Sequence, residues 1–127
     1  MVRQGVGAVI VESAYVSQQG RAHFNQLGIS EEEHLEGLEK LVKAVRDEGA
    51  AIGISLTHSG AKTSESICGE QPVGPSPFNF GRDYDTSREF DQGDREEIIL
   101  NFVHAAERAC EVGMNFIEIH GTDHFLL

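Results

Sequence analysis

Three short apolar runs, separated by stretches with helical periodicity, constrain the fold of this chain more than any other feature. The runs occupy residues 7–12 (GAVIVE), 51–56 (AIGISL) and 116–119 (FIEI). Short runs rich in β-branched residues are typical of buried strands. Strands that alternate with amphipathic helices form a parallel sheet through right-handed crossovers. The sequence therefore predicts an α/β fold with a βαβαβ order.

The two helices between these runs have apolar stripes and recognisable ends. Ser30 precedes Glu33 by three residues, the spacing of a capping box, and Gly49 is placed to end the helix. A second helix is expected from about Asp94 to Val112. The stripes that should pack on the sheet are Leu35, Leu38, Leu41, Val42 and Val45 in the first helix, and Ile98, Ile99, Phe102, Ala105, Ala106 and Ala109 in the second.

Long connections and free edges accompany this small sheet. Residues 13–29 and 61–88 are expected to be loops, and the second contains all three prolines. Loops of that length are functional or disordered. A sheet of three strands also leaves apolar edges that invite pairing. We therefore expect residues 1–127 to form a single partial domain, and its free edges are open to pairing with a second polypeptide or with copies of itself.

Charge and composition narrow the classes of partner. Acidic residues outnumber basic ones by 21 to 10, for a formal charge of −11. Nucleic acid and anionic membrane surfaces are therefore not expected as partners. No apolar run is long enough for a membrane span, and the start lacks the apolar stretch of a signal peptide. The two cysteines have no zinc-type spacing, so a reducing, cytoplasmic location is expected.

The closing segment carries the densest group of chemically capable side chains. His120, Asp123 and His124 follow directly after the third apolar run, and ligands in parallel α/β folds bind beyond the carboxyl ends of strands. Three interpretations stay open on spacing alone. The group is a transition-metal site, a set of polar residues capping a turn, or a site whose imidazoles hold an anion or a carbonyl oxygen.

Small polar residues near the ends of the first two strands are a second candidate. Ser13 and Ser55 would let a planar ligand approach the backbone, and ordinary packing explains them equally well. His58 follows the second strand, where a lone histidine is more often structural than catalytic.

Several segments of the chain resemble the old yellow enzyme family, the NADH:flavin oxidoreductases. Residues 7–21 (GAVIVESAYVSQQGR) resemble its second-strand segment, and residues 52–62 (IGISLTHSGAK) its third-strand signature. Residues 33–40 (EHLEGLEK) resemble a helix of the family, and Pro75-Ser76 falls at its proline-serine loop. Residues 117–121 (IEIHG) resemble the fourth strand. The segments follow one another in the family's order over nearly the whole chain.

The resemblance implies a fold and a cofactor. The family folds as a (β/α)₈ (TIM) barrel of about 250 residues or more, with FMN at the carboxyl ends of the strands. This chain would be the parallel-sheet fragment that contains strands two to four. The segments that supply most of the flavin's anchoring in the family lie outside that match, so we expect weak activity, or none, from the chain alone.

The resemblance also implies roles for individual residues. The family transfers hydride from NADH or NADPH to FMN and then to an activated alkene or enone, whose carbonyl is held by a pair of donors three residues apart. His120 matches the first donor, and Asp123 matches the second, where histidine or asparagine is expected. His124 stands where the family has glycine, and Phe125 where a tyrosine often donates the proton.

Cofactor contacts are carried over in the same way. Ser13 matches a small residue near the flavin edge, Ser55 replaces a glutamine that binds the flavin ring, and Ala61 replaces an arginine. The expected catalytic residues are therefore His120, Asp123 and His124. The expected cofactor-binding residues are Ser13, Ser55 and His120, with no metal. The alternative function is an assembly module that completes a barrel with another chain or by self-association.

Overall fold

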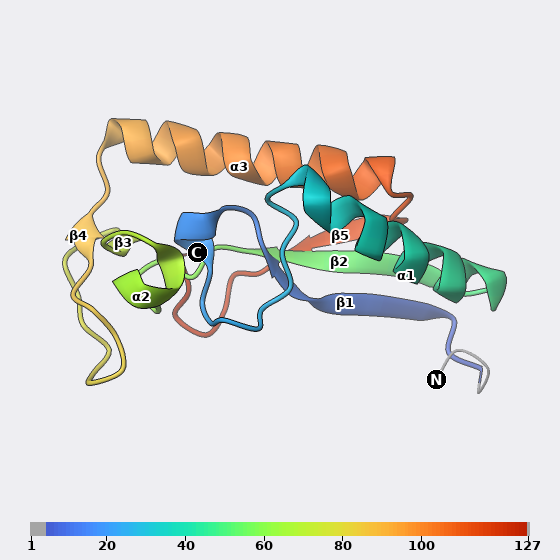
Figure 1. Cartoon of the computed structure of the whole chain (residues 1–127), viewed down its shortest axis with the longest axis horizontal. Coiled ribbons are helices and arrows are strands. Elements are labelled where there is room, and N and C mark those ends of the chain that lie inside the picture. Colours follow the sequence, from blue (N-terminus) through green and yellow to red (C-terminus); the bar gives the residue numbers. More distant parts are fainter. Residues whose placement is uncertain (1–4, 127) are drawn as a thin grey trace.

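The computed structural model describes residues 5–126 and confirms the predicted parallel α/β architecture. Strands β1 (Ala8–Tyr15), β2 (Ala51–Thr57) and β5 (Phe116–Ile119) form one sheet in the order β1-β2-β5, with both pairings parallel. Helix α1 (Leu35–Asp47) connects β1 to β2, and helix α3 (Gln92–Glu111) precedes β5. Figure 1 shows the helices lying along the sheet and the loops gathered near one end of the strands.

The long connections contain short regular elements rather than only coil. The first holds two 3₁₀ turns, η2 (Gln18–Gly20) and η3 (Glu32–His34). The second holds helix α2 (Glu65–Cys68) and a small parallel pair, β3 (Val73–Gly74) with β4 (Arg88–Glu89). No helix within residues 5–126 is long and apolar enough to cross a membrane.

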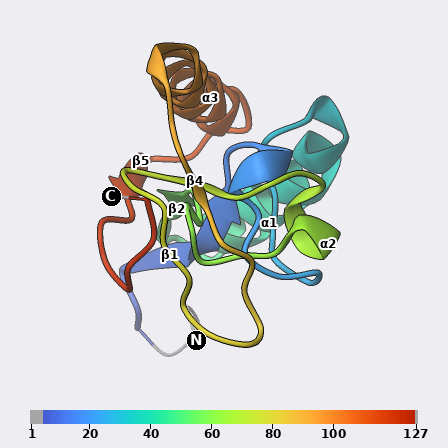
Figure 2. The same cartoon turned by 90° about the vertical axis from the view of Figure 1, so that its left-hand side faces the viewer.

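Both long helices cover the same face of the sheet, as Figure 2 shows. Alternate side chains of β2 point toward them, because successive residues of a strand face opposite ways. These side chains, Ile52, Ile54 and Leu56, are at most 1% exposed. They form the core with Ala14, Val16, Ile29, Leu38, Val42, Ala105, Ala109 and Val112. Within the described residues, the opposite face of the sheet carries no helix, and we call it the inner face.

Element boundaries differ from the sequence predictions where local hydrogen bonds compete. Strand β1 continues to Tyr15 instead of ending at residue 12, through a register shift between Val11 and Ala14. The predicted capping box at Ser30 is wrong by one residue, because the Glu31 N–H donates to His34 Nδ1 at 3.2 Å. Helix α3 begins earlier than predicted, since the side chain of Asp91 accepts a hydrogen bond from the Asp94 N–H at 2.9 Å.

Strand β5 is exposed, which corrects the prediction that this apolar run is buried. Ile117 and Ile119 are 42% and 58% exposed. Within residues 5–126, β5 pairs only with β2 and no helix follows it, so its second edge and part of each face have no neighbour. Two residues predicted to pack on the sheet are also exposed, Ile99 on α3 at 63% and Leu41 on α1 at 39%. The structure therefore has an apolar border along β5 and α3.

Candidate functional site

Polar side chains from all three strands meet on the inner face of the sheet, near the carboxyl ends. Ser55 pairs in register with Glu118, so their side chains share that face, and Ser55 Oγ donates to Glu118 Oε1 at 2.9 Å. The register shift in β1 places Ser13 beside them, with Ser13 Oγ 3.5 Å from Ser55 Oγ. His120 follows the end of β5, and its Nδ1 lies 3.4 Å from Ser13 Oγ.

Both ring nitrogens of His120 lie near polar side chains, and an aromatic ring packs against the imidazole. Its Nε2 lies 3.3 Å from Thr122 Oγ1 and 3.5 Å from Asp123 Oδ2. The Phe125 ring packs against it with centroids 5.3 Å apart. The His120 side chain is 17% exposed, whereas that of Asp123 is 70% exposed. The structure therefore brings His120 and Asp123 together at the rim, as an imidazole beside a carboxylate.

The turn that carries Asp123 has an unusual backbone. Asp123 and His124 have φ angles of 62° and 59°, a left-handed conformation that residues other than glycine seldom adopt. Lys62 stabilises this turn, because its Nζ donates to the Asp123 carbonyl at 2.8 Å and lies 5.6 Å from the Phe125 ring centroid. Strained backbone of this kind clusters at functional sites.

His124 points to a different place from His120. Its ring lies 6.0 Å from that of Phe80, and both line an apolar cleft of about 540 Å³ with Phe78 and Leu126. Within residues 5–126, no three histidine, cysteine, aspartate or glutamate side chains converge on a point that would hold a metal ion. His120, Asp123 and His124 therefore do not form one three-ligand site in this arrangement.

The three residues expected to contact the flavin differ in accessibility. Ser13 and His120 are partly exposed at the carboxyl end of the inner face, where they fit the polar edge of a planar heteroaromatic ring. Ser55 is 4% exposed and its hydroxyl proton is directed to Glu118. Ser55 therefore does not present its hydroxyl at the rim, and its side-chain partners on this face are Ser13 and Glu118.

His58 is a structural part of the same strand end. It is 1% exposed, and burial lowers its pKa to about 4, so the ring is neutral. Its Nδ1 accepts from the Gly60 N–H at 3.1 Å, and its carbonyl accepts from the Leu126 N–H at 3.0 Å. Gly20 packs on the ring so closely that a Cβ there would lie 2.6 Å from it.

Two contributors to this site have roles that sequence reasoning missed. Glu118 lies within the third predicted strand and is not among the predicted site residues, yet it accepts the hydrogen bond from Ser55. Lys62, which holds the Asp123 turn, follows the strand end of β2 by five positions. The alternation of inner and outer residues along β5 was a usable signal for Glu118. The contact of Lys62 depends on a turn about 60 residues later, so no local pattern indicates it.

A parallel sheet with helices on one face and polar groups at its carboxyl edge is the arrangement of a segment of a (β/α)₈ barrel. The solved structure of morphinone reductase matches it with a TM-score of 0.92 and 25% identity, over 98% of this chain and 38% of that one. The model of the NADH:flavin oxidoreductase / NADH oxidase family matches residues 2–127. The chain belongs to that family, the old yellow enzyme family.

Curated relatives agree with this assignment and show how much of a barrel is present. An NADPH dehydrogenase of Clostridium acetobutylicum is 44% identical over 123 residues, which are 97% of this chain and 36% of that protein. An NADH:acrylate oxidoreductase of Vibrio harveyi is 37% identical over 97% of this chain and 12% of its own length. The chain thus spans about a third of the NADPH dehydrogenase that it matches.

Proposed function

We propose that this chain supplies the strand two to strand four segment of an FMN-dependent NAD(P)H oxidoreductase of the ene-reductase type. The observation that carries the proposal is the position of His120, held beyond the end of β5 with both ring nitrogens in hydrogen-bond range of neighbouring side chains. Family membership supports the cofactor, and the NADPH and NADH named for the two relatives leave the choice of reductant open. A cytoplasmic location is part of the same proposal.

Bound FMN would supply the redox chemistry, by passing hydride from the reduced nicotinamide to an activated alkene or enone. In the proposal, Ser13 and His120 lie against the flavin edge and Ser55 supports Ser13. His120 also holds the substrate's carbonyl oxygen, on which negative charge develops.

Three residues that differ from the family pattern, Asp123, Phe125 and His124, have other roles in the proposal. Asp123 in its ionised form only accepts hydrogen bonds, so it orients His120 rather than replacing the second donor. Phe125 has no proton to give, and its ring limits the movement of His120. His124 stays in the proposal as a substrate contact, because it lines the aromatic cleft beside Phe80.

Activity is proposed to require the remaining strands of a barrel. The free edge of β5 and the chain's coverage of about a third of its relative support this requirement. The test is a chimera in which residues 5–126 replace the matching segment of the Clostridium acetobutylicum NADPH dehydrogenase. We expect the chimera to retain FMN and to reduce an enone with NADPH, and the isolated chain to show at least a hundredfold lower turnover.

A matched chimera with His120→Ala should keep its flavin spectrum and lose enone reduction. Full activity in that variant would contradict the role of His120. Rapid turnover by the isolated chain with added FMN would contradict the requirement for further strands.

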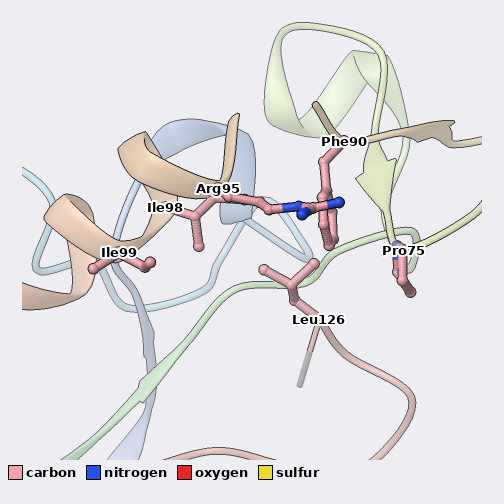
Figure 3. Close-up of a pocket in the computed structure, with 6 residues that line it drawn as sticks. All are labelled: Pro75, Phe90, Arg95, Ile98, Ile99 and Leu126. Carbon is pink, nitrogen blue, oxygen red and sulfur yellow. The ribbon is translucent and has the colours of Figure 1, made fainter. Parts of the chain in front are cut away.

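The second candidate function is assembly, and the apolar border favours it. Besides β5, the border includes a cleft of about 440 Å³ between α3 and the closing segment. Figure 3 shows the Leu126 side chain pointing into this cleft, below the side chain of Arg95. The ring of Phe90 lies beside the guanidinium end of Arg95. A second copy, or a chain that carries the remaining barrel strands, would cover this border by pairing with β5.

A further inference from the structure

Lys62 carries a positive charge at the rim of the candidate site, and no acidic side chain of the described residues pairs with it. An ammonium group has three N–H donors. One donates to the Asp123 carbonyl at 2.8 Å, and the ammonium lies 5.6 Å from the centre of the Phe125 ring. Within residues 5–126, no carboxylate forms an ion pair with Lys62. Two of its donors are therefore left for another acceptor.

Two other basic side chains in the loops at the same end of the sheet are already engaged. Arg21 donates to two backbone carbonyls of its own loop and lies over the ring of Tyr15. Arg88 forms an ion pair with Asp94. Lys62 differs from both, because its ammonium keeps free donors and lines a cleft.

This cleft has a volume of about 350 Å³ and is lined by Ala22, His23, Lys62, Tyr84, Asp123 and Phe125. A volume of this size falls in the range of small-molecule sites. The imidazole of His23 and the phenol of Tyr84 each carry a hydrogen-bond donor. Phe125 also packs against His120, with ring centroids 5.3 Å apart. The cleft therefore adjoins the position proposed for the carbonyl of the substrate.

Asp123 is the acidic residue that lines this cleft, and its carboxylate lies toward His120. Its Oδ2 accepts from Thr122 Oγ1 at 3.2 Å and lies 3.5 Å from His120 Nε2. Lys62 instead contacts the backbone carbonyl of the same residue. The Asp123 carboxylate should therefore weaken the binding of an anion in the cleft, although it does not pair with the ammonium.

We propose that Lys62, with His23 and Tyr84, binds an anionic oxygen group of a ligand in this cleft. The group is a carboxylate of the substrate or the pyrophosphate of the reduced nicotinamide dinucleotide, since both present charged oxygens to an ammonium. A chain with a formal charge of −11 repels anions as a whole, so such a ligand needs a local cation. This inference deepens the proposed function, and the identity of the ligand rests on that function.

The test is an NMR titration of the full chain without cofactor. The probes are but-2-enoate, inorganic pyrophosphate and the neutral but-2-enamide. The backbone amide of His124 reports binding, because it belongs to the peptide group whose carbonyl accepts from Lys62. We expect a saturable shift with at least one anion, weakened by added salt, and none with but-2-enamide. The anion that binds more tightly identifies the source of the charged group as substrate or reductant.

Four variants make the test specific. Lys62→Met removes the charge and should weaken anion binding about tenfold, whereas Lys62→Arg keeps the charge and should retain binding. Asp123→Asn removes the opposing carboxylate and should tighten binding, so it tests the site even if Lys62→Met disturbs the turn. Lys43→Met is the matched control, because Lys43 is an exposed lysine on α1 that pairs with Asp47, and its loss should leave the affinity unchanged.

Three results would overturn the proposal. They are the absence of a His124 shift with both anions, an equal shift with but-2-enoate and but-2-enamide, and unchanged affinity in folded Lys62→Met and Asp123→Asn. The titration requires neither flavin nor turnover. Anion binding by the chain together with a chimera that does not retain FMN would contradict the proposed function alone. An active chimera together with a chain that binds neither anion would contradict this inference alone.

Discussion

The ring of Phe116 packs against Gly53, its register partner on the neighbouring strand. A Cβ at position 53 would overlap the ring, so this pair joins β2 to β5 on the inner face only because residue 53 is glycine. This contact forms an apolar layer on the inner face, next to the hydrogen-bonded pair Ser55 and Glu118.

Gly53→Ala should therefore destabilise the fold. The added methyl forces the Phe116 ring or the strand to move, and overpacking of this kind costs about 1–3 kcal/mol. The measurement is urea unfolding followed by circular dichroism. Gly37→Ala is the matched control, because a Cβ on Gly37 meets nothing within 4 Å. That helix substitution should stabilise by about 0.5–1 kcal/mol. Equal stability of Gly53→Ala and the wild type would contradict the contact.

Burial of His58 should make stability depend on pH between about 6.5 and 4. Its pKa is about 4 in the fold and 6.5 in its ordinary state, so the unfolded chain binds the extra proton in that window. The contribution of neutral, buried His58 to the free energy of unfolding is fully present above pH 6.5, and it falls as the pH is lowered toward 4. A shift of this size corresponds to a loss on the order of 3 kcal/mol.

Urea unfolding at a series of pH values measures the His58 effect. His58→Gln should be less stable at neutral pH and should lose less stability across the window. His104→Gln, which removes a half-exposed histidine on α3, should keep the wild-type slope. The same slope in His58→Gln and the wild type would show that other groups cause the dependence.

The ion pair at the start of α3 should matter more than its surface position suggests. Arg88 contacts both oxygens of Asp94 at 2.5 and 2.7 Å, and Asp94 Oδ2 also accepts from the Asp91 N–H. The hydrogen bonds from Arg88 lower the pKa of Asp94 to about 2. Because the folded pKa is depressed, this stability is present above about pH 3.8 and is lost as the pH falls toward 2.

Asp94→Asn should cost about 1 kcal/mol at neutral pH, discounted because Arg88 is 37% exposed and its charge is screened by water. Thermal unfolding at pH 7 measures the loss. Asp47→Asn is the control, since Asp47 forms an exposed i,i+4 pair with Lys43 and should change stability by less than about 0.5 kcal/mol. If Asp94→Asn lost no more stability than Asp47→Asn, the Arg88–Asp94 pair would contribute little to the free energy of unfolding.

The free β5 edge should mediate self-association of the isolated chain. Ile119→Lys places a charge on this apolar border, and charged edge residues prevent strand pairing. Light scattering after size-exclusion chromatography should show a concentration-dependent increase in mass for the wild type and a monomer for the variant. Leu41→Lys, an exposed apolar position on α1, should associate like the wild type. A monomeric wild type would contradict association through this edge.

The sequence by itself determined the order of strands and helices, the parallel sheet and the family. It could do so because these predictions rest on local features of the chain: the periodicities of strands and helices, the glycines that end helices, and the family motifs. The same reasoning located His120 and Asp123 near each other, because they are three positions apart after a strand. It also placed β5 in the interior, since a run of apolar residues does not reveal whether a neighbour will cover it.

Only the tertiary structure decided what each polar group contacts. The register of β2 with β5 aligned Ser55 with Glu118, and the shift in β1 brought Ser13 within reach of His120. Asp123 lies beside His120 and His124 beside Phe80, although the two residues are adjacent in the sequence. These contacts join residues 42 to 107 positions apart, and such distances are set by strand pairing, which no local pattern encodes.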